Sequence, residues 1–134
     1  MRFFNKGLLV VLGFICPQLA FAAGSSDEVK SLLSKSFDKP NKPLVTELVA
    51  VEGDYAIADW LQGSMGGRAL LVKESGAWKV LVCGGSALTE LSNLKAARVP
   101  EKTAITLLSH LVQQEKSMTS DKLILINAFK ERKH

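Results

Sequence analysis

The sequence predicts an α+β domain in which a four-stranded antiparallel meander is covered on one face by an N-terminal helix and C-terminal helices. Three observations lead to this prediction. Residues 44–83 contain runs of β-branched, aromatic and other apolar residues with a period of two. Short turns that contain glycine separate these runs. The segments before and after them carry apolar residues at helical spacing.

The strands are expected near residues 44–51, 54–62, 68–74 and 77–83. Side-chain alternation places Trp78, Val80 and Val82 on one face of the last strand and Lys79, Leu81 and Cys83 on the other. Because Lys79 marks the wetter face, the side chains around Trp78 are predicted to form the core. Their expected partners on the N-terminal helix are Val29, Leu33 and Phe37. Asp59 and Trp60 are expected to have structural roles.

Helix signals flank the predicted sheet. Ser25 and Glu28 form a capping box at the start of the first helix, which Lys39-Pro40 ends. A helix over about 100–115 carries one apolar stripe, with His110 on the opposite, solvated side. The last segment, residues 121–130, suits either a buried strand or a helix, and Ser120 as an N-cap favours the helix.

The N-terminus has the pattern of a secretory signal peptide. Arg2 and Lys6 form a basic region, residues 7–15 are apolar, and Ala20-Phe21-Ala22 is a cleavage site of small residues. We therefore expect residues 1–22 to be removed and residues 23–134 to form a single exported domain. The apolar run is shorter than the roughly 20 residues that a membrane-spanning helix needs, so the mature protein is not expected to be membrane-embedded.

Charge and motif content narrow the function classes. The formal net charge of +4 includes Arg2 and Lys6 of the predicted leader, so the mature chain is only weakly basic. Nucleic-acid binding is therefore not expected, since it needs lysines and arginines clustered on one face. Paired carboxylates, a nucleophile with its base, or a metal triad at telling spacing are not recognisable in the sequence. The protein is accordingly predicted not to be an enzyme.

Two sulfur-bearing residues are the candidate site residues. Cys83 is the single thiol left after removal of Cys16 with the leader, so an internal disulfide cannot form. Such a thiol is buried and inert, pairs with another chain, or binds a soft ligand. Met65 lies among glycines in residues 63–67, a predicted loop, and either fills a core gap or presents its thioether to solvent. Phosphate binding by this loop is disfavoured, because a strand follows it and no Lys-Ser/Thr is present.

Several blocks of this sequence resemble one bacterial family. They are EGDYAIADW at 52–60, QGSMGGRALL at 62–71, Gly76-Ala-Trp78, Cys83-Gly-Gly and the Val-Pro start of the later helix. Over about Val29 to Val112 the chain is similar to the small exported copper uptake system-associated proteins. The resemblance implies a periplasmic location and an association with copper receptors of the outer membrane or with periplasmic copper chaperones. The positions carried over from the family are Met65, Gly66, Gly67, Arg68 and Cys83.

Together these features predict an accessory protein of copper uptake. The expected metal ligands are Met65 and Cys83, because thioether and thiolate sulfur suit cuprous copper and the antiparallel strands bring both residues to one end of the sheet. No run rich in histidine or methionine accompanies them, so weak binding is expected rather than storage. The alternative is a metal-free module that binds another protein or a small ligand.

Overall fold

A computed structural model describes residues 24–130 of the 134. The N-terminal helix covers residues 24–37. Four strands follow, namely β1 (Val45–Glu52), β2 (Tyr55–Gln62), β3 (Met65–Glu74) and β4 (Ala77–Gly84). A 3-10 turn η1 (Ser86–Thr89) leads to α2 (Leu91–Ala96), α3 (Glu101–Glu115) and α4 (Ser120–Asn127). The predicted leader, residues 1–22, lies outside the described residues.

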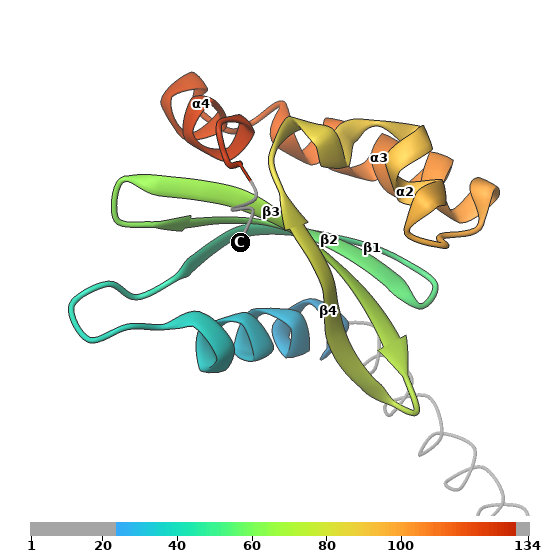
Figure 1. The fold of residues 1–134 in the computed structure, drawn as a ribbon, viewed down its shortest axis with the longest axis horizontal. Helices are drawn as coiled ribbons and strands as arrows, with labels where there is room; N and C mark the ends of the chain where they lie inside the picture. The colour runs from blue at the N-terminus through green and yellow to red at the C-terminus, as the bar shows by residue number, and fades with distance from the viewer. Residues whose placement is uncertain (1–23, 131–134) are drawn as a thin grey trace, which may run out of the picture.

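The strands form one antiparallel sheet in the order β1-β2-β3-β4 (Figure 1). The predicted fold class, an α+β meander packed against an N-terminal helix and C-terminal helices, is confirmed. Two-residue turns connect the strands, with positive φ at Gly53, at Gly63, and at both Ser75 and Gly76. Positive φ in the first position of a hairpin turn matches the twist of the flanking strands. The glycine pattern therefore sets the positions of the strand ends.

The glycine-rich segment around Met65 is strand rather than the predicted loop. Met65 pairs with Gln62, and the two following glycines pair with Leu61 and Trp60. Gly63 and Ser64 alone complete the turn, so the hairpin is tighter than the glycine count suggests. Glycine backbone forms ladder hydrogen bonds as well as any other residue, and the missing side chains leave room for whatever packs on the strand.

The helices cover both faces of the sheet, whereas the sequence predicts all of them on one face. In Figure 1 the N-terminal helix lies on one side and α2, α3 and α4 lie on the other. The reason is that the central strands are apolar on both faces. Ala56, Ala58 and Leu71 pack with the N-terminal helix, and Ile57 and Leu70 pack with the C-terminal helices. Sheets buried on both faces lose the simple apolar and polar alternation from which a single core face was inferred.

The predicted core around Trp78 is confirmed in part. Trp78 is buried in the same cluster as Val29 and Leu33. Phe37, the third predicted partner from the N-terminal helix, is 38% exposed and lies near the end of that helix. Val82 packs on the opposite face, with the C-terminal helices.

A bulge in β4 explains why Val82 changes face. Leu70 of β3 pairs with Val82 and the next residue, Leu71, pairs with Val80, so Leu81 is an extra residue in β4. An extra residue shifts the side-chain alternation by one position from there on. Cys83 therefore joins the face of the N-terminal helix, on the side of Trp78, rather than the opposite side as predicted.

The C-terminal helices settle two further predictions. Residues 120–127 are helical, which confirms the favoured alternative for the last segment. His110 of α3 is about half exposed, as expected, but Ile105 and Val112 are exposed as well. Only Ala104, Leu107 and Leu111 of α3 are fully buried, because α3 rests on the sheet along a narrow stripe. Within residues 24–130, no helix has both the length and the apolar character needed to cross a bilayer.

Candidate sulfur groove and arginine cluster

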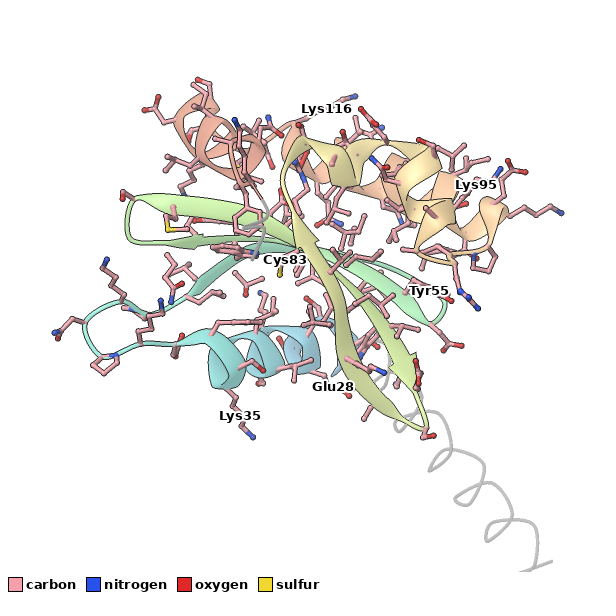
Figure 2. All side chains as sticks on the ribbon, in the orientation of Figure 1. Glu28, Lys35, Tyr55, Cys83, Lys95 and Lys116 are labelled. Carbon is pink, nitrogen blue, oxygen red and sulfur yellow. The ribbon has the colours of Figure 1, made fainter. Side chains whose placement is uncertain are left out.

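Met65 and Cys83 line the same cavity, between the sheet and the end of the N-terminal helix. We call this cavity, of about 420 Å³, the sulfur groove. Met65 is 50% exposed at its rim, and Cys83 is half-buried in its wall. Figure 2 shows Cys83 near the centre of the molecule. The other lining residues are Ser36, Phe37, Asp38, Lys39, Leu44, Trp60, Gln62 and Phe129.

The loop that follows the N-terminal helix forms one wall of the groove. The Oδ1 atom of Asp38 accepts a hydrogen bond from the backbone N–H of Leu44 at 2.7 Å. The Nε2 atom of Gln62 donates to the carbonyl oxygens of Phe37 at 2.7 Å and Lys42 at 2.9 Å. A side-chain amide of β2 thus ties this loop to the sheet, and the wall is positioned before any ligand binds.

Aromatic side chains form the floor of the groove. The rings of Trp60 and Phe129 meet edge to face, with centroids 5.5 Å apart. Both rings lie over Gly67, where an added Cβ atom would be 2.7 Å from the Trp60 ring and 3.1 Å from the Phe129 ring. Only a residue without a side chain fits under such a pair, so Gly67 is required by packing and not by its φ angle.

The two sulfur residues occupy different levels of the groove. Cys83 pairs with Ala69, and Met65 lies four residues before Ala69 in β3. Four residues of strand span about 13 Å, whereas a metal–sulfur bond is about 2.3 Å long. The strand register therefore brings Met65 and Cys83 to one groove but separates them along it, so they do not form a closely spaced pair of ligands. Among the residues that the structure describes, no group of three or more His, Cys, Asp and Glu side chains is placed to hold a metal ion.

A buried arginine cluster lies on the other face of the sheet. Arg68 of β3 is only 1% exposed. Its guanidinium makes a bidentate contact with the carboxylate of Glu115 at the end of α3, with Nη2 to Oε2 at 2.8 Å and Nε to Oε2 at 3.1 Å. The Nε atom of Arg68 is also 3.3 Å from Oδ1 of Asp59 in β2. Bidentate contacts of this kind are among the stronger polar interactions in proteins.

The same guanidinium holds two further chain segments. Its Nη1 atom donates to the carbonyl oxygen of Gly85 at 2.9 Å and to Oδ1 of Asn127 at 2.7 Å. Gly85 follows β4, and Asn127 is the last residue of α4. Arg68 therefore connects the sheet, α3, α4 and the exit of β4 through one planar group.

The two carboxyl groups that face Arg68 differ in charge state. Asp59 is fully buried, and neither of its oxygens has a hydrogen-bond partner among the described residues. Burial, and then the neighbouring carboxylate of Glu115, raise the pKa of Asp59 from 3.8 to about 9, against the opposing effect of Arg68. At neutral pH Asp59 is thus a neutral acid, and a single negative charge balances Arg68.

The cluster was only partly visible in the sequence. Asp59 was expected to be structural, and its complete burial agrees with that role. The resemblance points to the position of Arg68 but assigns it no role, and no sequence pattern marks Glu115. The pair of glycines before Arg68 is the sequence signal that another segment packs closely on this strand. Added Cβ atoms at Gly66 and Gly67 would meet Ile126 and Phe129, so these glycines let the C-terminal segment lie directly on β3.

Comparison of this chain with protein-family models, with curated proteins and with solved structures gives no match.

Proposed function

We propose that this chain is a periplasmic accessory protein of copper uptake, a binding protein and not an enzyme, whose sulfur groove holds cuprous copper weakly or docks a copper receptor or chaperone. The observation that carries the proposal is the bulge at Leu81, which turns Cys83 toward the groove that Met65 also lines. The resemblance to copper uptake system-associated proteins and the predicted leader, which lies outside the described residues, support it.

The chemistry of the groove fits this cargo. Thioether and thiolate are soft ligands that prefer cuprous copper to harder ions. Because Met65 and Cys83 lie at different levels of the groove, each would supply one ligand to a metal that a partner's sulfur also contacts. A site with one ligand from this protein is weak and open. Such a site suits transfer of copper between a receptor and a chaperone, and it does not suit storage.

A metal-free binding module is the second candidate, and the lining of the same groove favours it. Phe37, Leu44, Trp60 and Phe129 give the groove apolar walls, and Gln62 and Asp38 are committed to holding the loop. The volume of about 420 Å³ lies within the range of about 300–1,000 Å³ that is usual for small-molecule pockets. An apolar side chain of a partner protein would be the corresponding occupant.

Anaerobic titration with cuprous ion against a chromophoric competitor tests the copper proposal. We expect the wild-type protein to bind cuprous ion in preference to zinc, and Cys83→Ser and Met65→Leu each to weaken binding without unfolding the protein. Met118→Leu is the matched control, because Met118 lines a different cavity, next to Glu47 and Lys122. Equal cuprous affinity of the wild-type protein and Cys83→Ser would contradict the copper site and leave the metal-free module as the better account.

A further inference from the structure

Arg68 holds two short segments that each lead into a wall of the sulfur groove. Gly85, which accepts from Nη1, comes two residues after Cys83. Asn127, which accepts from the same atom, comes two residues before Phe129. Cys83 and Phe129 both line the groove on the opposite face of the sheet. One buried nitrogen atom therefore holds both segments from the face of the sheet opposite the groove.

The two segments have little freedom to move independently. A Cβ atom added at Gly85 would lie 2.6 Å from the carbonyl oxygen of Asn127 and 2.7 Å from that of Phe129. A Cβ atom at Gly66 would lie 3.0 Å from the backbone nitrogen of Ile126. Backbone thus packs directly on backbone at this edge of the sheet. A displacement of Asn127 or Gly85 has to be passed on to Phe129 and Cys83, because no flexible side chain lies between them to absorb it.

The position of the guanidinium depends on the charges that face it. Glu115 of α3 and Asp59 of β2 approach it, and Asn127 of α4 contributes a neutral amide. On two of the packed elements, Glu47 of β1 and Lys122 of α4 form an ion pair with each other at 3.1 Å. With one proton on the two carboxyl groups, the cluster is neutral. Without it, Arg68 faces two negative charges, and a net charge is buried.

We propose that Arg68 is a positioning residue of the sulfur groove, and that a proton on the buried carboxyl group of Asp59 keeps its guanidinium bonded to Gly85 and Asn127. Loss of the proton draws Nε of Arg68 towards Asp59 and separates the two carboxylates. The Nη1 bonds to Gly85 and Asn127 are then broken or lengthened. The groove walls at Cys83 and Phe129 shift as a result. The identity of the ligand in the groove rests on the proposed function. The coupling between the arginine cluster and the groove is independent of that proposal.

Fluorine NMR of the protein labelled with 5-fluorotryptophan tests this coupling without any metal. Trp60 touches Phe129, whereas Trp78 lies in the same core and serves as the internal reference. Resonances are assigned with Trp78→Phe. Between pH 7 and 10 we expect the Trp60 resonance to move along a titration curve while the Trp78 resonance stays in place. In Asp59→Asn, which carries no titrating carboxyl group, the movement of the Trp60 resonance should be lost.

Either of two results would overturn the proposal. One is a Trp60 resonance that does not titrate in the wild-type protein. The other is a titration that persists unchanged in Asp59→Asn, because it would then come from another group.

A second pair of variants acts on the other end of the coupling. Asn127 is exposed, so Asn127→Ala removes one acceptor of Arg68 with little risk to the fold. We expect it to shift the Trp60 resonance at pH 7. Lys122→Ala is the matched control on α4, since it breaks the ion pair with Glu47 and leaves Arg68 untouched. Equal effects of the two variants on Trp60 would refute the role of Arg68. If copper binding fails but these fluorine results hold, only the proposed function is wrong.

Discussion

Replacing Asp59 by Asn should stabilise the protein at neutral and alkaline pH. Burial, with the neighbouring carboxylate of Glu115, raises the pKa of Asp59 from 3.8 in an exposed chain to about 9 in the folded protein. Between these two values the folded state binds one proton more than the unfolded state. The stabilisation from this proton is complete below pH 3.8 and is lost as the pH rises towards 9, at about 1.4 kcal/mol per pH unit. At pH 7 the loss amounts to about 4 kcal/mol.

The substitution separates this titration from all others. Asn has nearly the shape of the protonated carboxyl group, and its neutral amide costs far less to bury than a carboxylate. Urea unfolding followed by circular dichroism at pH 5, 6, 7 and 8 gives the free energy of unfolding of each variant. We expect the wild-type free energy to fall with pH over this range and the Asp59→Asn values to be nearly constant. The gain from the substitution should therefore grow with pH.

Two control variants guard the interpretation. Asp54→Asn makes the same chemical change at an exposed turn residue and should leave the slope of the wild-type protein intact. His110→Gln removes a half-exposed imidazole whose Nδ1 lies 3.9 Å from Oε2 of Glu52, outside the arginine cluster. The reasoning is refuted if the wild-type stability does not change between pH 5 and 8, or if Asp59→Asn keeps the wild-type slope.

Two further predictions concern packing. Trp78→Ala should lower the free energy of unfolding by about 3–5 kcal/mol, because the indole is buried against the N-terminal helix. His110→Ala should have little effect. A small effect of Trp78→Ala on the free energy of unfolding would contradict the assignment of Trp78 to the core. Gly85→Ala should cost about 1–3 kcal/mol through overpacking, because its Cβ would press on backbone oxygens, whereas Gly84→Ala meets only the flexible side chain of Leu88. Equal thermal stabilities of the two glycine variants would contradict the close packing described for Gly85.

The sheet could be predicted because its signals are local. The period of two, together with turns such as Ser75-Gly76, marks strand ends within a few residues, and the structure follows them closely. The bulge at Leu81 has no comparable signal in the sequence. Residues 80–83 (VLVC) are compatible with regular strand alternation, so the extra residue cannot be recognised there. The predicted facing of Cys83 failed for that reason, although its place at the same end of the sheet as Met65 did not depend on it.

The arginine cluster could not be predicted, because its members are far apart in sequence. Glu115 contacts Arg68 across 47 positions, and Asn127 across 59. Glu115 ends a polar run, Gln113-Gln114-Glu115, that reads as the solvated end of a helix. Only the docking of α3 on the sheet turns this carboxylate inward. A polar residue acquires such a role from tertiary contacts, and single-sequence patterns do not describe these contacts.

The close fit of residues 125–129 on Gly66, Gly67 and Gly85 has a consequence for the order of folding. A chain that emerges with its N-terminus first exposes the whole meander before the partners of Arg68 arrive from α3 and α4. Until then Arg68 and Asp59 remain hydrated, which removes any penalty for burying them early. Contacts between distant segments close large loops and form slowly. Docking of the C-terminal segment should thus be the late step, in which water leaves the charged cluster and the groove acquires its final walls.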